Sequence, residues 1–132
     1  MSIQRSNIPW LLPPVGWSHI SKAPAGPTLY LSGLGPLDSE GNIADKTDLH
    51  AQALVTLKKI RRALEEAGAS PSNMLKQTIY VVELTEEKMA TVSAAARQVF
   101  GEDFAPATTA VGVASLARID MLIEVECIVL MD

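Results

Sequence analysis

Only one cysteine, Cys127, occurs among the 132 residues, so no disulfide can form within the chain and a reducing cytoplasm is the expected location. The start of the sequence also lacks a leader in which charged residues precede an apolar stretch, and gives no sign of secretion. No run approaches the roughly 20 apolar residues that span a membrane, because Glu124 and Glu126 interrupt the apolar C-terminal region. We therefore expect a soluble cytoplasmic protein without a membrane partner.

Basic residues are in short supply as well. Eleven Lys and Arg stand against 15 Asp and Glu, for a formal net charge of -4. This balance provides no long-range positive field that would attract phosphates, so nucleic acid is not expected as a main partner. Clusters of Asp, His and Cys with metal-ligand spacing are absent from the sequence, as is a glycine-rich phosphate loop that leads into a helix. No metal or nucleotide cofactor is therefore expected.

Hydrophobic side chains make up 48% of the sequence. At this chain length they suffice for one packed core and not for two, which predicts a single domain over residues 1–132. Five of the eight prolines lie in the first 27 residues. Because each proline removes a backbone donor, we expect at most short edge strands in residues 1–27.

Two helices are predicted from the spacing of apolar residues. Such residues recur at every third or fourth position over 48–67, where Thr47 or Asp48 can cap the start and Gly68 can end the helix. The same periodicity and the same kinds of boundary residue return over 85–101. These two segments are the helices of the predicted fold.

Segments rich in β-branched and apolar residues predict strands over 28–32, 75–84, 108–114 and 121–131. Helices that alternate with strands require crossover connections, so the expected fold class is α+β, with both helices on one face of a mixed sheet. The opposite face then remains uncovered. A second copy of the chain is the expected cover, because exposed apolar sheet faces mark sites of association.

Four segments, in order and spacing, resemble one family. Residues 16–18 (Gly-Trp-Ser), 31–33 (Leu-Ser-Gly), 106–109 (Pro-Ala-Thr-Thr) and 123–126 (Ile-Glu-Val-Glu) resemble the Gly-Pro-Tyr-Ser, Val-Ser-Gly-Gln, Pro-Ala-Arg-Ser and Ile-Glu-Ile-Glu segments of the reactive intermediate deaminase family, also called RidA or YjgF. The resemblance extends from about residue 16 to the C-terminus. It implies a chorismate-mutase-like fold and a homotrimer with a central barrel, in which small-molecule ligands bind in the clefts between subunits.

The resemblance also implies which residues carry the chemistry. In the family's deaminases an arginine of the Pro-Ala-Arg-Ser segment pairs with the substrate carboxylate, and a glutamate helps to position the water that hydrolyses an imine. Thr108 stands in place of this arginine, and a hydroxyl cannot offer the bidentate pairing of a guanidinium. Hydrolysis of the usual 2-imino acids is therefore not expected. Glu124 is the better match for the catalytic glutamate, and Glu126, on the same strand face, is the alternative.

Further residues near these segments are candidates for substrate binding. Trp17 replaces a tyrosine of the family and can offer a flat apolar wall to an unsaturated ligand. Ser32 can form a hydrogen bond, and Gly33 can let backbone N–H groups face a ligand. Arg118, in the loop before the last strand, is a possible substitute for the missing guanidinium. Each of them, like Thr108, also has a purely structural explanation as a core, strand, turn or surface residue.

Two nearby residues that can titrate are not assigned to the site. His19 is interpreted as a surface histidine. Cys127 shares its strand face with apolar neighbours and is predicted to be an inert core thiol.

The sequence thus favours a trimeric RidA-type hydrolase of a small imine or enamine, in which Glu124 places the water. Two alternatives stay open. One is a non-catalytic trimer that binds a small molecule on a retained scaffold. The other is a tautomerase, or an accessory enzyme of a specialised pathway, that uses the same acid without net hydrolysis.

Overall fold

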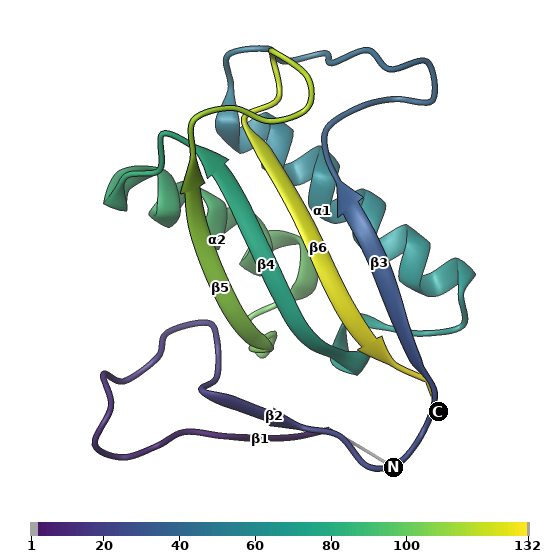
Figure 1. Cartoon of the computed structure of the whole chain (residues 1–132), viewed down its shortest axis with the longest axis vertical. Coiled ribbons are helices and arrows are strands. Elements are labelled where there is room, and N and C mark those ends of the chain that lie inside the picture. The colour runs from purple at the N-terminus through teal and green to yellow at the C-terminus, as the bar shows by residue number, and fades with distance from the viewer. Residues whose placement is uncertain (1–2, 132) are drawn as a thin grey trace.

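Figure 1 shows a computed structural model of the protein, in which residues 3–131 are described: a four-stranded sheet lies against two helices, and a short N-terminal arm passes one end of the sheet. In chain order the elements are β1 (Gln4–Ser6), β2 (Ile20–Lys22), β3 (Thr28–Leu34), α1 (Leu49–Glu66), a single 3-10 turn (Pro71–Asn73), β4 (Met74–Val82), α2 (Glu86–Phe100), β5 (Ala107–Val113) and β6 (Ile123–Leu130). This order confirms the predicted alternation of strands and helices.

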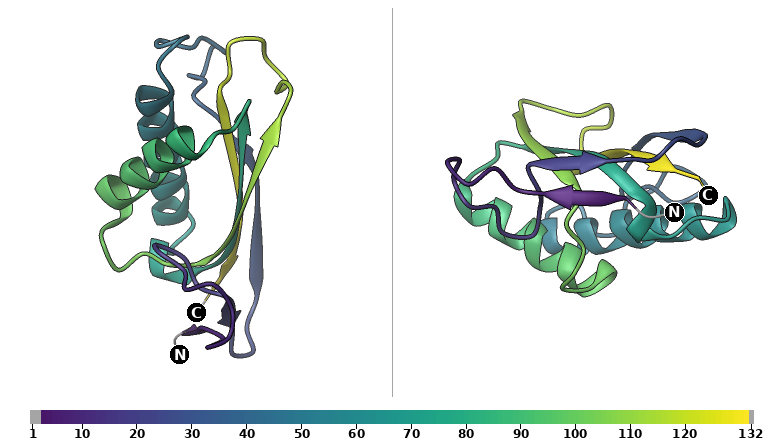
Figure 2. Two further views of the ribbon diagram at one scale, coloured as in Figure 1. Left: turned by 90° about the vertical axis from the view of Figure 1, so that its left-hand side faces the viewer. Right: turned by 90° about the horizontal axis from the view of Figure 1, so that it is seen from below.

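The main sheet has the strand order β3-β6-β4-β5. Strand β6 runs antiparallel to both β3 and β4, whereas β4 and β5 are parallel because α2 forms the crossover between them. Both helices lie on the same face of this mixed sheet, as the two views in Figure 2 show. The predicted α+β fold class is therefore confirmed. The proline-rich arm contributes β1 and β2, a separate antiparallel pair of three-residue strands.

The helix boundaries follow the predicted signals. Asp48, rather than Thr47, caps α1, and its carboxylate accepts a hydrogen bond from the Ala51 N–H at 3.0 Å. Thr85 caps α2 in the same way, and Gly101, at a φ of 95°, ends it in a backbone conformation that glycine adopts at little cost. The local sequence thus determines where both helices start and stop.

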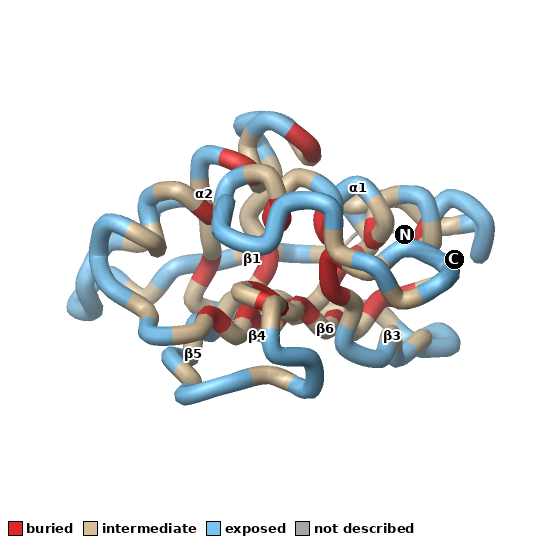
Figure 3. Tube along the Cα trace, turned by 90° about the horizontal axis from the view of Figure 1, so that it is seen from above, coloured by how far each residue is buried: buried red, intermediate tan, exposed pale blue. Residues whose placement is uncertain are grey.

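The hydrophobic core lies between the helices and the sheet, where buried positions concentrate in Figure 3. Side chains of β6 alternate: Val125 and Cys127 are buried against the helices, and Glu124 and Glu126 point to the other face. Burial, together with the charge of Glu126, raises the pKa of the Cys127 thiol to about 11. Cys127 is therefore the unreactive core thiol that the sequence predicts.

No helix covers the opposite face of the sheet within the part of the chain that the structure describes (Figure 2). Tyr30 of β3 is 77% exposed there, and the acids of β6 share this face. We call this surface the open face. It is the surface that the sequence predicted to be left uncovered.

Candidate functional site

Glu124 lies on the open face directly beside Gly33 of the neighbouring strand β3. The pairing of β3 with β6 shifts register between Leu31 and Leu34, and Gly33 lies within this irregularity. A Cβ atom at position 33 would come within 2.6 Å of the Glu124 Oε2 atom. Only glycine therefore leaves room for the carboxylate in this position, and the structure brings two predicted site residues together.

The two acids of β6 differ in their hydrogen bonds. The Tyr80 hydroxyl donates to Glu126 Oε1 at 2.5 Å, and this hydrogen bond is the main reason why the pKa of Tyr80 is raised above its usual value. The Glu124 carboxylate accepts no such bond from any residue between 3 and 131. Glu124 is thus the carboxylate that is free to accept a bond from water or a ligand, which favours it over Glu126.

Ser32 precedes Gly33 on β3 and borders a second part of the open face. It lines a hollow of about 440 Å³ together with Tyr30, Lys76 and Glu126. The Lys76 ammonium donates to the Thr109 hydroxyl at 2.6 Å. Ser32, Gly33 and Glu124 therefore form one group of candidate residues on the open face.

Thr108 and Trp17 form a second group, on the face of the sheet that the helices cover. Both line a small pocket of about 50 Å³ between α2 and the sheet, with Gln77 of β4 and Arg97 of α2 among the other walls. The Gln77 side-chain amide donates to the Thr108 hydroxyl at 3.0 Å, and that hydroxyl donates to the Pro106 carbonyl at 3.0 Å. Both the donor and an acceptor position of Thr108 are therefore used within the chain.

The N-terminal arm places Trp17 beside Thr108 through its neighbour Ser18. Ser18 is buried, and its hydroxyl donates to the Ala105 carbonyl at 2.7 Å while its N–H donates to the Pro106 carbonyl at 3.3 Å. These bonds tie the arm to the start of β5. Sequence reasoning did not assign this role to Ser18, although the serine belongs to the segment that resembles the family.

His19 braces the loop of the arm. Its Nδ1 atom accepts a hydrogen bond from the Ile8 N–H at 2.9 Å, and its Nε2 atom lies 3.0 Å from the Leu12 carbonyl. Its ring also packs edge-on against Trp17, with 5.2 Å between the ring centroids. The histidine thus has structural partners on both ring nitrogens, which the sequence interpretation of a surface residue did not include.

Arg118 is remote from Thr108 within one chain. It lies in the loop after β5, against the turn at Gly41, where a Cβ atom would be 3.3 Å from an Arg118 guanidinium nitrogen. Thr108 stands near the start of β5, at the other end of that strand. Within a single chain the structure does not bring these two candidates together.

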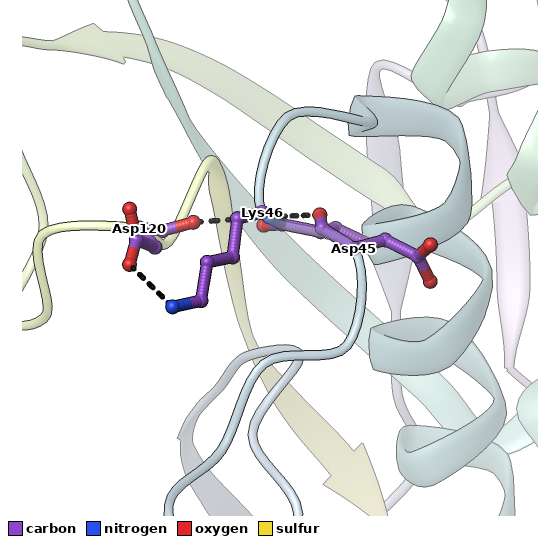
Figure 4. Close-up of polar contacts among 4 residues, drawn as sticks. Asp45, Lys46 and Asp120 are labelled. Atoms are coloured by element: carbon purple, nitrogen blue, oxygen red, sulfur yellow. Dashed lines mark hydrogen bonds and ion pairs between the residues drawn. The ribbon is translucent and has the colours of Figure 1, made fainter.

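The loop that carries Arg118 is held by Gln52, a residue of α1 that is fully buried. The Gln52 amide donates to the carbonyls of Asp45 and Asp120 at 2.8 and 2.9 Å, and its oxygen accepts from the Leu122 N–H at 2.8 Å. Figure 4 shows the same junction, in which the Lys46 ammonium reaches the Asp120 carboxylate at 3.6 Å. In the sequence, the signal for this role of Gln52 was a polar residue beside the apolar stripe of the predicted helix.

Lys59 of α1 is a second polar residue that sequence reasoning missed. Its ammonium donates to the carbonyls of Gly35 and Leu37, both at 2.6 Å, and thereby supports the turn that follows Gly33. Burial lowers the pKa of Lys59, and the charge of Asp38 partly opposes this effect. No pattern in the sequence predicts this contact.

Residues 3–131 contain neither a membrane-spanning helix nor a cluster of metal-ligating side chains. Neither helix has the combination of length and apolar character that crossing a bilayer requires. His, Cys, Asp and Glu side chains do not gather in groups of three or more that could hold a metal ion.

By its fold and its two residue groups the protein belongs to a class of small α+β proteins. Helices cover one face of its sheet, and the other face carries an acid. The family described as Endoribonuclease L-PSP matches residues 11–131. The chain belongs to this family, and similar solved structures include members of the Rid and YjgF groups. The resemblance to the RidA/YjgF family is thereby confirmed.

Individual relatives give the degree of similarity. The 2-iminobutanoate/2-iminopropanoate deaminase of Salmonella typhimurium is 32% identical over 130 residues, which cover 96% of this chain and 94% of that protein. A Rid-family protein of unknown function from Yersinia pestis superposes with a TM-score of 0.89 at 29% identity, over 99% of this chain and 100% of that one. The structure of Escherichia coli TdcF with bound serine superposes with a TM-score of 0.69 at 25% identity, over 100% and 99% of the two chains.

Proposed function

We propose that the protein hydrolyses a small imine or enamine in a cleft between subunits, with Glu124 as the residue that positions and deprotonates the water. The observation that carries this proposal is the Glu124 carboxylate, which lies beside Gly33 without a hydrogen-bond donor from residues 3–131. In the reaction the water oxygen bonds to the imine carbon, the C–N bond breaks and the nitrogen leaves as ammonia with the protons of water. The relative that deaminates 2-imino acids supports this chemistry.

A trimer would bring the two residue groups around one ligand. In a single chain Glu124 and Gly33 lie on the open face, whereas Trp17 and Thr108 lie on the helix side of the sheet. They can act on the same molecule only if different subunits contribute them. The uncovered open face supports the same arrangement, because association would bury Tyr30 and its neighbours.

Sedimentation equilibrium is expected to give three times the chain mass of 14.1 kDa. Tyr30→Lys should shift the protein toward monomer, because it places a charge in the proposed interface. The matched substitution Val55→Lys, on the helix side, should leave the mass unchanged. A wild-type monomer would contradict the proposed assembly.

The proposed substrate is not a usual 2-imino acid, because Thr108 offers no guanidinium and its hydroxyl is already bonded to Gln77 and Pro106. We expect ammonia release from a larger imine that lacks a carboxylate on the imine carbon. With freshly generated 2-iminopropanoate we expect little acceleration by the wild type and a clear gain for Thr108→Arg. High wild-type activity on 2-iminopropanoate would show that another group replaces the arginine.

Two alternative functions give different results in the same assays. A ligand that raises the melting temperature without turnover would favour a binding protein. Deuterium exchange into a product without ammonia release would favour a tautomerase or an accessory enzyme. Endoribonuclease activity, which the family description names, is not proposed, because a net charge of -4 provides no long-range positive field to attract RNA. The cytoplasmic location stays a prediction from the sequence.

A further inference from the structure

Arg97, in the last turn of α2, lines the small pocket that also contains Trp17 and Thr108. On the helix wall of this pocket its nearest neighbours in the sequence are Ser93, one turn earlier, and Ala96, and the larger side chains of Met89 and Val92 line the wall further along α2. A residue with five N–H donors is thus available in the pocket where Thr108 replaces the expected arginine.

Arg97 is the charged side chain of this pocket whose donors are available to a ligand. The Thr108 hydroxyl donates to the Pro106 carbonyl, and the Gln77 amide donates to Thr108. Within residues 3–131 the Arg97 guanidinium forms neither a hydrogen bond nor an ion pair. Arg61, by contrast, donates to the Val99 carbonyl at 2.8 Å.

The size of the pocket restricts which part of a ligand it can hold. Its free volume of about 50 Å³ is enough for a few water molecules, each of which needs about 10–15 Å³. A carboxylate has three heavy atoms and fits this space, but a whole substrate does not. The remainder of a ligand would have to extend out of the pocket.

We infer that Arg97 binds the carboxylate of the ligand, and that this carboxylate is separated from the carbon that reacts. That this carbon reacts is part of the proposed function, whereas the binding of the carboxylate by Arg97 does not depend on that function. A carboxylate that enters beside Trp17 meets a planar guanidinium, which pairs with it through two parallel hydrogen bonds. Because the pocket holds a carboxylate but not a whole substrate, the reacting carbon lies outside it and the ligand is longer than a 2-imino acid.

A structural role of Arg97 must be separated from this one. A cation in the last turn of a helix also stabilises the helix dipole. Lysine supplies the same charge but cannot pair bidentately with a carboxylate. Arg97→Lys should therefore preserve the melting temperature and lose part of the binding, whereas Arg97→Gln should weaken the binding further.

Calorimetric titration with stable amine analogues tests the inference. The probes are serine, 3-aminobutanoate and 4-aminopentanoate, each with its primary amide. We expect the 3- and 4-amino acids to bind the wild type more tightly than serine and than their own amides. Arg97→Gln should weaken the binding of these acids by about 10-fold or more, and Arg97→Lys by less. Arg62→Gln, at an exposed surface pair with Glu66, is the matched control and should bind like the wild type.

Several results would overturn the inference. They are equal affinity for acids and amides, no binding of any acid by the wild type, or loss of acid preference in Arg118→Gln with full retention in Arg97→Gln. Ammonia assays separate this inference from the proposed function. Binding that depends on Arg97 without turnover of any imine would retain the anion site and refute the hydrolase.

Discussion

Replacement of Glu124 by Gln is expected to lower the rate of ammonia release by about 100-fold or more, the usual contribution of a general base. Glutamine has nearly the same shape, so it fits beside Gly33 as the carboxylate does. It cannot take a proton from water. Ammonia release from the best imine substrate measures the effect, and sedimentation and thermal melting should match the wild type.

Two further variants make this experiment specific. Glu66→Gln removes an exposed carboxylate of α1 and should leave the rate unchanged. Glu126→Gln removes the acid that the Tyr80 hydroxyl already engages and should have a smaller effect than Glu124→Gln. Full activity of Glu124→Gln would refute its assignment, and a larger loss in Glu126→Gln would transfer the role to that residue.

Replacement of Gln52 by Leu is expected to cost about 3–5 kcal/mol of unfolding free energy, because it leaves several buried polar groups without a partner. These groups are the carbonyls of Asp45 and Asp120 and the N–H of Leu122. Leucine has a similar volume, so the loss reports on hydrogen bonding rather than on a cavity. Urea unfolding at a fixed protein concentration measures it, since assembly would otherwise shift the midpoint.

The matched control is Gln98→Leu, the same substitution at an exposed position of α2. It should change stability by no more than about 0.5 kcal/mol. A loss below about 1 kcal/mol in Gln52→Leu would mean that water or rearranged backbone satisfies the three groups. In that case Gln52 would not be what holds the loop of Arg118.

The secondary structure could be predicted because its causes are local. The apolar spacing of α1 and α2 and the caps at Asp48 and Thr85 depend on residues a few positions apart. The alternation along β6, which buries Cys127 and turns Glu124 to the other face, follows from the period of a strand. These features needed no knowledge of the partners across the core.

The candidate site was predictable only in part. The sequence singled out Gly33 and Glu124 separately, but their contact depends on the antiparallel pairing of β3 with β6 and its shift in register. It also suggested Arg118 as a replacement for the missing guanidinium. The structure places Arg118 against Gly41 and puts Arg97 beside Thr108 instead.

The sequence by itself therefore determined the two helices with their boundaries, the approximate positions of the four strands of the main sheet and the face of β6 that carries the acids, since periodicity and capping act over a few residues. Only the tertiary structure decided which side chains meet. The support of the turn at Gly35 by Lys59, the bonding of Thr108 by Gln77 and the place of Arg97 in that pocket all join residues more than ten positions apart. Such contacts depend on how the strands order and how the helices pack on the sheet, which no local pattern encodes.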